Sequence, residues 1–293
     1  MPTVAYLGPE HTNTHMAAQA KFGRRSRYVH APTVDDVFEL VEQKGADYGV
    51  VPIENSLEGA VTHTLDQFVG IGAAIKIHGE IEQPIRHSLI MHADAELGEL
   101  KIVYSHPQVL AQCRGWLDRH LPHVQRAETN STAEAVNWLG ITTIQGSVYW
   151  GGGPTTSIEP RHRAAIARSE LASKKLGQWE LKAIPIPDNR ENKTRFLILG
   201  LGEPKKGKRN KTSILFSLKD RPGALYDALT PFKRERINLT KIESRPSKRK
   251  AWEYYFFIDL EGHETEPRVK RALGMLKRRA EFLKVLGSYP ITK

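Results

Sequence analysis

Short apolar runs alternate with amphipathic segments over the first two thirds of the chain. Strand-like apolar runs cover residues 4–7, 48–53, 102–104 and 163–167. Helical spacing of apolar residues covers residues 12–23, 57–68 and 109–120, and a further helix opens at about Ser131. This alternation of strand and helix favours an α/β fold with largely parallel sheets.

Polar side chains occupy the loops between these strands and helices. In α/β sheets a ligand lies beyond the carboxyl ends of the strands, where helix N-termini converge. Hydroxyl and amide side chains at those N-termini suit an anion, particularly a carboxylate. The alternative for each residue is that it only caps its own helix. The side chains in question are Thr12, Thr14, Asn55, Ser56, Ser105, Ser131 and Thr132.

The last third of the chain has a different order of elements. Residues 201–211 are rich in Gly, Pro and like charges and predict a solvated linker. Beyond the linker, strand-like segments are expected at 212–218, 237–243, 252–260 and 285–289, and helices at 223–232 and 266–283. The order βαββαβ predicts a ferredoxin-like α+β sandwich of about 75 residues.

Composition and charge narrow the class of protein. The formal net charge is +10, and it belongs to the tail: residues 201–293 hold 23 Lys or Arg and 11 Asp or Glu, whereas residues 1–200 hold 20 and 22. A basic tail is compatible with nucleic acid, an acidic partner or a solvated surface. The single cysteine, Cys113, excludes an internal disulfide, and no apolar run is long enough to span a bilayer. We expect a cytoplasmic location without membrane association.

One long motif identifies a family. Residues 51–66 fit the pattern V-P-I-E-N-S-x-x-G-x-V-x-x-x-x-D, which closely resembles the signature of prephenate dehydratases. The tail resembles the ACT domain attached to these enzymes, through G-A-L at 223–225 and E-S-R-P at 243–246. Further matches follow in family order at residues 7–10, 84–89, 105–113, 131–135, 164–167 and 192–196.

The resemblance implies a fold and an activity. It implies a two-lobed, periplasmic-binding-protein-like catalytic domain with an interdomain cleft over residues 1–200, followed by an ACT regulatory domain over 212–290. From the pattern, lobe 1 takes about 1–78 and 168–200, and lobe 2 about 79–167. The implied reaction is the decarboxylative dehydration of prephenate to phenylpyruvate in L-phenylalanine biosynthesis. It implies no cofactor, L-phenylalanine as allosteric effector, and a homodimer or homotetramer.

The same resemblance assigns candidate site residues. The threonine of T-R-F, Thr194, is the expected assistant of the departing hydroxyl, with Asn55 and Ser56 beside the substrate. Arg195 is a further catalytic candidate that either grips a carboxylate or forms a structural salt bridge. Glu54 is expected to be structural, because a carboxylate repels a dianionic substrate. The substrate-binding candidates are Thr12, Thr14, Pro52, Ser105, Gln108, Ser131, Thr132 and Phe196. The effector-binding candidates are Gly223, Ala224, Leu225, Asn238, Glu243, Ser244, Arg245 and Pro246.

The chain departs from the family pattern in two places. His11 stands where the family has a glycine, which puts the shape of that loop in question, and Thr14 replaces a serine. The stretch 138–159 is longer than the family's usual connection and is expected to be a surface or interface loop. His87 and His106 are expected to be ordered loop histidines, and no pattern of residues predicts a metal site.

Two alternatives stay open at this point. Arogenate, which carries an amine where prephenate has a side-chain ketone, is a second possible substrate. An RNA-binding or ligand-binding protein without catalysis is a distant alternative, because the basic βαββαβ tail carries aromatic residues over 252–257. No chorismate mutase segment precedes Val4, so a monofunctional enzyme is expected.

Overall fold

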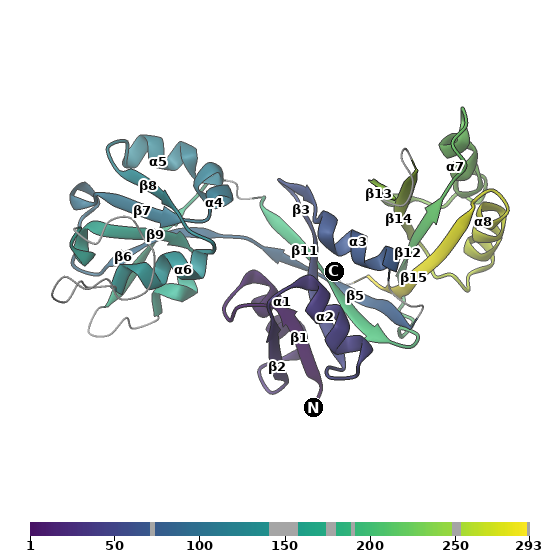
Figure 1. The fold of residues 1–293 in the computed structure, drawn as a ribbon, viewed down its shortest axis with the longest axis horizontal. Coiled ribbons are helices and arrows are strands. Elements are labelled where there is room, and N and C mark those ends of the chain that lie inside the picture. The colour runs from purple at the N-terminus through teal and green to yellow at the C-terminus, as the bar shows by residue number, and fades with distance from the viewer. Residues whose placement is uncertain (71–73, 141–157, 174–179, 189–190, 248–252, 292–293) are drawn as a thin grey trace. The chain divides into compact units, whose positions relative to one another are not determined.

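Contacts divide the chain into two compact units (Figure 1). The computed structural model describes residues 1–70, 74–140, 158–173, 180–188, 191–247 and 253–291. The first unit comprises residues 1–83 and 193–293, and the second comprises residues 84–192. The sequence pattern placed residues 168–192 with lobe 1, whereas here they belong to the second unit. The strand Leu181–Ile186 explains the difference, because it pairs with the strand His87–His92. Most of the long stretch 138–159 lies outside the described residues.

The first unit contains a mixed six-stranded sheet in the order β2-β1-β3-β11-β5, with β4 paired to β3. Strands β1, β2 and β3 are parallel, and β11 runs antiparallel to β3. Helix α1 covers one face, where Ala17 and Ala18 pack with Val4, Val50 and Phe196. Helices α2 and α3 cover the other face. The elements are β1 (Thr3–Leu7), α1 (Asn13–Phe22), β2 (Arg27–Ala31), α2 (Val34–Glu42), β3 (Tyr48–Asn55), β4 (Gly59–Ala60), α3 (Thr62–Gly70), β5 (Ile75–Pro84) and β11 (Lys193–Leu201).

The tail of the first unit confirms the predicted βαββαβ order. Its four-stranded antiparallel sheet has the order β13-β14-β12-β15, and Figure 1 shows α7 and α8 side by side on one face. The helix predicted to reach Leu283 ends at Lys277, because Phe282 and Leu283 pair as a strand with Ser217 and Phe216. The elements are β12 (Asn210–Ser217), α7 (Ala224–Arg234), β13 (Leu239–Pro246), β14 (Tyr254–Glu261), α8 (Pro267–Lys277) and β15 (Phe282–Pro290).

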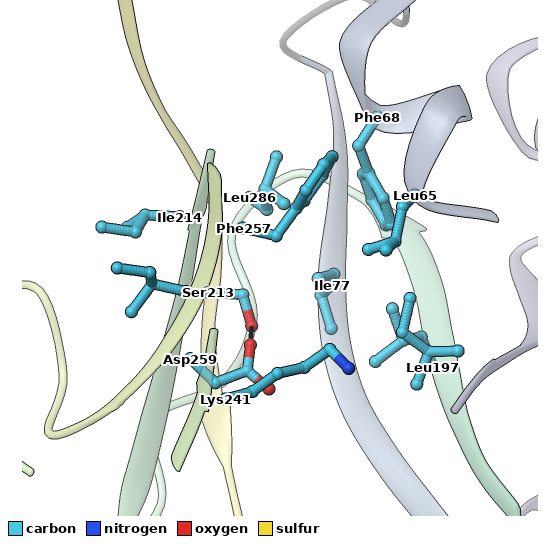
Figure 2. A pocket seen from close by; sticks show the side chains of 12 residues that line it. Leu65, Phe68, Ile77, Leu197, Ser213, Ile214, Lys241, Phe257, Asp259 and Leu286 are labelled. Carbon is cyan, nitrogen blue, oxygen red and sulfur yellow. Dashed lines mark hydrogen bonds between the residues drawn. The ribbon is translucent and has the colours of Figure 1, made fainter. Parts of the chain in front are cut away.

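The other face of the tail's sheet packs on the six-stranded sheet. Tyr255 and Phe257 share one apolar core with Phe68 and Ile77. Contact is close at Gly287, where an added Cβ would lie 2.3 Å from the carbonyl oxygen of Ile77. Figure 2 shows the side chains around a cavity of about 20 Å³ at this junction. Because Tyr255 and Phe257 are 6% and 3% exposed, they do not form the open stacking platform that RNA recognition requires.

The second unit is a five-stranded mixed sheet in the order β10-β6-β9-β7-β8. Strands β9, β7 and β8 are parallel, whereas β6 and β10 are antiparallel to their neighbours. The single helix predicted over 109–120 is two helices that meet at Cys113, which packs in the core beside Trp116. The elements are β6 (His87–His92), β7 (Ile102–Ser105), α4 (Pro107–Gln112), α5 (Arg114–His120), β8 (Gln125–Glu128), α6 (Thr132–Asn137), β9 (Arg163–Ala167) and β10 (Leu181–Ile186), with short 3₁₀ turns at 97–99, 138–140, 160–162 and 169–173. Within the described part of the chain, no helix is long and apolar enough to cross a membrane.

Candidate active site

Asn55 and Thr194 lie opposite each other at the carboxyl edge of the six-stranded sheet. Asn55 ends β3, Thr194 lies at the start of β11, and the two residues are partners in the ladder. The Nδ2 atom of Asn55 donates a hydrogen bond of 3.0 Å to Oγ1 of Thr194. Two residues 139 positions apart in the sequence therefore form one polar pair, at the edge where α/β sheets bind ligands.

A turn fixes the orientation of the Asn55 amide. Its Oδ1 accepts hydrogen bonds from the backbone N–H groups of Leu57 and Glu58, at 2.9 and 3.2 Å. The other end of the amide, Nδ2, must then face Thr194 as the donor. Because Thr194 Oγ1 accepts this bond, its own proton is directed elsewhere. Accepting one hydrogen bond also polarises a hydroxyl and strengthens it as a donor.

The neighbouring hydroxyls mainly hold the loops in place. Ser56 Oγ accepts from the backbone N–H of Lys193 at 3.0 Å, which ties the start of β11 to the end of β3. Thr12 is the N-cap of α1: its Oγ1 accepts from the backbone N–H of His15 and donates to the carbonyl of Leu7. The contacts of Ser56 and Thr12 therefore fit the alternative in which these hydroxyls only hold the local backbone. Thr14, one residue inside α1, is 5% exposed.

His11 occupies the loop before α1 in a left-handed conformation. Its φ is +66°, the region that a glycine adopts at no steric cost. Histidine is among the residues that tolerate this region best after glycine. The conformation is supported by a hydrogen bond of 3.0 Å from the His11 backbone N–H to Nδ1 of His15. The His15 ring stacks on Tyr6 with ring centroids 4.4 Å apart, and burial lowers the pKa of His15 below its ordinary value. The loop therefore retains the backbone shape that the family's glycine allows.

The backbone at position 11 is directly testable. Replacing His11 with valine should lower the free energy of unfolding by about 1–2 kcal/mol, because a β-branched residue clashes in the left-handed region. Replacing His11 with glycine should not lower it. Chemical denaturation followed by circular dichroism measures both. Equal stabilities for the valine and glycine variants would contradict the left-handed backbone at this position.

Arg195 lies beside Thr194 on β11 but belongs to an internal ion network. Its guanidinium pairs with Glu54 at 2.5 Å, Glu80 at 3.3 Å and Asp259 at 2.9 Å. Burial alone would lower the pKa of Arg195, but the carboxylates of Asp259, Glu80 and Glu54 raise it above its usual value. Of the two interpretations of Arg195, the salt bridge is the one that these contacts favour.

The acidic residues of the 51–66 motif pair with cations of the tail. Lys241 on β13 lies 3.2 Å from Glu54, and the guanidinium of Arg245 makes two 3.3 Å contacts with Asp66. Burial raises the pKa of Glu54, but Arg195 and Lys241 outweigh that effect and lower it overall. Glu54 is therefore a structural anion, as expected from the sequence, and the motif serves the junction as well as the site.

In the second unit, the candidate residues gather at one edge of its sheet. Ser105 ends β7 and Ser131 caps α6 just beyond β8, which is the parallel neighbour of β7. Ser105 is fully buried, and its Oγ donates to the carbonyl of Ile166 at 2.7 Å. Ser131 Oγ accepts from the backbone N–H of Glu134, and Thr132 is the first residue of α6. Gln108 is exposed in the first turn of α4. Ser105 and Ser131 thus have structural partners within the unit.

Two further substrate candidates contribute through packing or backbone. Phe196 is 1% exposed and lies in the core beneath α1, so its ring supports β11 rather than contacting a ligand. The Pro52 carbonyl accepts a hydrogen bond of 2.7 Å from Thr64 Oγ1, which anchors α3 to β3. Two histidines were expected in loops. His106 precedes α4, and its Nδ1 accepts from the backbone of Gln108. His87 is instead the first residue of β6, where its Nε2 contacts Gln112.

The effector candidates lie on two segments of the tail. Gly223 precedes α7 in a left-handed conformation, with φ +77°, and nothing lies within 4 Å of an added Cβ. Ala224 opens α7, and Leu225 packs partly into the tail's helical core. Asn238 precedes β13 and accepts from the Glu261 backbone through its carbonyl. Glu243, Ser244, Arg245 and Pro246 form the end of β13.

The buried charges Glu80, Lys211 and Asp259 were not singled out from the sequence. Glu80 is 5% exposed on β5, and Lys211 Nζ lies 2.7 Å from its carboxylate. Asp259 is 8% exposed on β14. The available signal was a lone charge inside an apolar strand pattern, as in Asp259 within residues 254–260. A buried charge requires a partner of opposite charge, so such a residue predicts that a partner exists but does not show which residue it is.

Comparisons with known proteins agree over nearly the whole chain. A family model described as prephenate dehydratase matches residues 4–204, and one described as ACT domain matches residues 212–274. A bifunctional chorismate mutase/prephenate dehydratase of Aquifex aeolicus is 47% identical, covering 98% of this chain and 73% of that protein. Arogenate dehydratase 2 of Petunia hybrida is 34% identical, covering 98% and 71%. The solved structure of Arthrobacter aurescens prephenate dehydratase in complex with L-Phe has a TM-score of 0.82 at 33% identity, covering 98% and 89%.

Proposed function

The chain belongs to the prephenate dehydratase family, and we propose that it converts prephenate to phenylpyruvate, water and carbon dioxide in L-phenylalanine biosynthesis. The observation that carries this proposal is the Asn55–Thr194 hydrogen bond, which joins the two motifs that the family resemblance assigned to the site. The enzyme is a carbon–oxygen lyase with a C-terminal ACT domain.

The chemistry requires little more than orientation and one hydrogen bond. The ring carboxylate leaves as carbon dioxide, and its bonding electrons enter the ring as the hydroxyl departs. The hydroxyl leaves with the electrons of the C–O bond, and the resulting hydroxide takes up one proton from solvent to become water. Aromatisation provides the driving force. The Thr194 hydroxyl is a very weak acid, so it assists by a hydrogen bond to the departing oxygen that strengthens as the C–O bond breaks. Asn55 holds Thr194 in the orientation in which its proton faces the substrate.

The hydroxyl and amide groups at the sheet edges are proposed to receive the two carboxylates of the substrate. In the first unit, Thr12 caps α1 and Thr14 lies in its first turn. In the second unit, taken by itself, Ser131 caps α6 and Thr132 is its first residue. Backbone N–H groups at such termini attract anions. Ser56, Ser105 and Gln108 complete the proposed set. The proposed substrate-binding role of Pro52 and Phe196 is limited to the support of β3 and β11.

Arogenate is the alternative substrate, because a plant arogenate dehydratase is 34% identical to this chain. The decisive assay supplies each compound separately to the purified protein and measures phenylpyruvate from prephenate and phenylalanine from arogenate. We expect a higher kcat/KM with prephenate. A higher value with arogenate would change the substrate and retain the reaction.

L-Phenylalanine is proposed as the allosteric effector of the ACT domain, with subunits paired as a homodimer or homotetramer. The support is the relative from Arthrobacter aurescens, which was solved in complex with L-Phe. Helix α7 begins after the left-handed Gly223 without a side-chain cap, and the backbone N–H groups of its first turn are proposed to bind the amino-acid carboxylate. The end of β13, residues 243–246, is proposed to shape the neighbouring loop. The cytoplasmic location stays a prediction.

A matched pair of glycine variants tests the effector site. Gly223 and Gly202 both have φ +77°, and neither has an atom within 4 Å of an added Cβ, so alanine strains both backbones equally. Each variant should lose about 1 kcal/mol of unfolding free energy. Only Gly223→Ala should weaken L-phenylalanine binding, by about tenfold or more. Calorimetric titration measures the affinity, and equal affinities in the two variants would contradict the proposed site.

A further inference from the structure

Two adjacent cross-strand pairs connect the candidate site to the ACT domain. Thr194 faces Asn55 in the ladder of β11 and β3, and the next pair is Arg195 with Glu54. Neighbouring side chains on a strand point to opposite faces of the sheet. The pair Arg195–Glu54 therefore lies behind the pair Thr194–Asn55, on the face that packs against the ACT domain.

The ladder is irregular at this point. Its register shifts between Arg195 and Phe196, because Phe196 pairs with Pro52 and leaves Ile53 as an extra residue on β3. A bulge of this kind bends the strand and interrupts the regular hydrogen bonds of the ladder. The regular ladder beyond the bulge therefore does not by itself fix the position of Thr194 relative to Asn55.

Two residues of the ACT domain form ion pairs with Arg195 and Glu54. Asp259 Oδ2 on β14 lies 2.9 Å from Arg195, and Lys241 on β13 lies 3.2 Å from Glu54. The side chains of Arg195 and Asp259 are 13% and 12% exposed, so solvent screens their contact little. Lys241 is 8% exposed, but its partner Glu54 is 35% exposed, so solvent screens that contact more. Figure 2 shows Lys241 extending from the ACT strands toward the catalytic lobe.

The Asp259 carboxylate is itself fixed in place. Ser213 Oγ donates to Asp259 Oδ1 at 2.6 Å, and this bond is drawn in Figure 2. Ser213 Oγ also lies 2.8 Å from the hydroxyl of Tyr289, a residue with no exposed surface. A carboxylate oriented by such partners presents its other oxygen to Arg195 in one geometry.

We propose that Asp259 and Lys241 are positioning residues for the reaction, although they lie on the ACT domain. They hold Arg195 and Glu54, and through the adjacent backbone they set the distance between Asn55 and Thr194. The inference rests on the proposed function for its kinetic consequence. An error of about 1 Å in such a geometry lowers a rate by about a hundredfold, so the ACT domain contributes to turnover even without effector.

Kinetics on the full chain test the proposal. Asp259→Asn keeps the shape and a hydrogen-bond acceptor for Ser213 but removes the charge, and Lys241→Met removes the charge of Lys241. Each variant should lower kcat for prephenate at least tenfold and change KM less than twofold. Lys241→Arg keeps a cation and should retain at least a third of the wild-type kcat.

Glu235→Gln is the matched control. Glu235 pairs with Arg271 at 2.7 Å within the ACT domain, away from β3 and β11. This variant also removes one ACT-domain charge of an ion pair, and it should keep the wild-type kcat within twofold. Equal losses of kcat in Glu235→Gln and Asp259→Asn would overturn the proposal. Loss of any charge in the ACT domain would then lower kcat, whether or not that charge contacts Arg195.

A second measurement separates this inference from the proposed function. The methyl signal of Thr194, labelled with ¹³C-methyl threonine and assigned with Thr194→Ser, reports the surroundings of this residue without any substrate. It should shift in Asp259→Asn and Lys241→Met and stay in place in Glu235→Gln. If the wild type does not convert prephenate, the proposed function fails and the methyl signal alone decides. Signals that coincide with the wild type in Asp259→Asn and Lys241→Met would overturn the positioning role.

Discussion

Replacing Thr194 with alanine should lower kcat for prephenate by about 10²–10³-fold, the usual cost of removing one donor to charge that develops in the transition state. KM should change only a few-fold, because the hydrogen bond to the departing oxygen strengthens as the C–O bond breaks. Asn55 remains in place in this variant, held by the backbone N–H groups of Leu57 and Glu58. Steady-state assays of phenylpyruvate formation give both constants.

Two further substitutions at this position separate the hydroxyl from the shape. Thr194→Ser keeps the hydroxyl that accepts from Asn55 and should retain kcat within about tenfold of wild type. Thr194→Val keeps the shape, removes the hydroxyl and should fall to the level of the alanine variant. If the valine variant turned over as fast as serine, Thr194 would not be the group that assists the departing hydroxyl.

Replacing Arg195 with methionine should destabilise the first unit by about 3–5 kcal/mol, the usual cost of leaving buried charges without their partner. Arg195 contacts three carboxylates. Two of them belong to buried residues: as whole residues, Glu80 and Asp259 are 5% and 8% exposed. Lys211 and Lys241 neutralise only part of that negative charge. Chemical denaturation followed by circular dichroism measures the loss.

Arg271→Met is the control for this prediction. Arg271 pairs with Glu235 at 2.7 Å, as closely as the partners of Arg195, but its side chain is 60% exposed. Exposed pairs contribute below about 1 kcal/mol. Similar losses of stability in Arg195→Met and Arg271→Met would mean that the network of Arg195 is not desolvated as the structure indicates.

The fold class followed from local patterns in the sequence. Alternating strands and helices predicted the α/β part, and the βαββαβ order predicted the tail; the family matches confirm both. The division into lobes could not be predicted from local patterns, because β10 joins the second sheet by pairing with β6, about 90 residues earlier in the chain. The end of α8 was misplaced because Phe282 and Leu283 follow the helical segment closely as apolar residues, whereas their pairing with β12 makes them part of β15.

The candidate site shows the same limit. Family motifs identified Asn55 and Thr194 as candidates, and the structure joins them by a hydrogen bond. The expectation that Glu54 is structural agrees with its ion pairs. The sequence left the role of Arg195 open, because its partners lie 64, 115 and 141 positions away. His11 looked like a disruption of the first loop. It adopts the left-handed backbone that a glycine would, and a nearby histidine ring supports it.

The proposed function is tested most directly by the rate of phenylpyruvate formation from prephenate by the purified chain, with and without L-phenylalanine. We expect turnover without added metal or cofactor, and a change of rate when L-phenylalanine binds to the ACT domain. Because Arg195, Glu54 and Asp66 contact this domain directly, an effect on its packing should reach the site. A purified chain that binds L-phenylalanine but forms no phenylpyruvate under any condition would show that the proposed function is wrong.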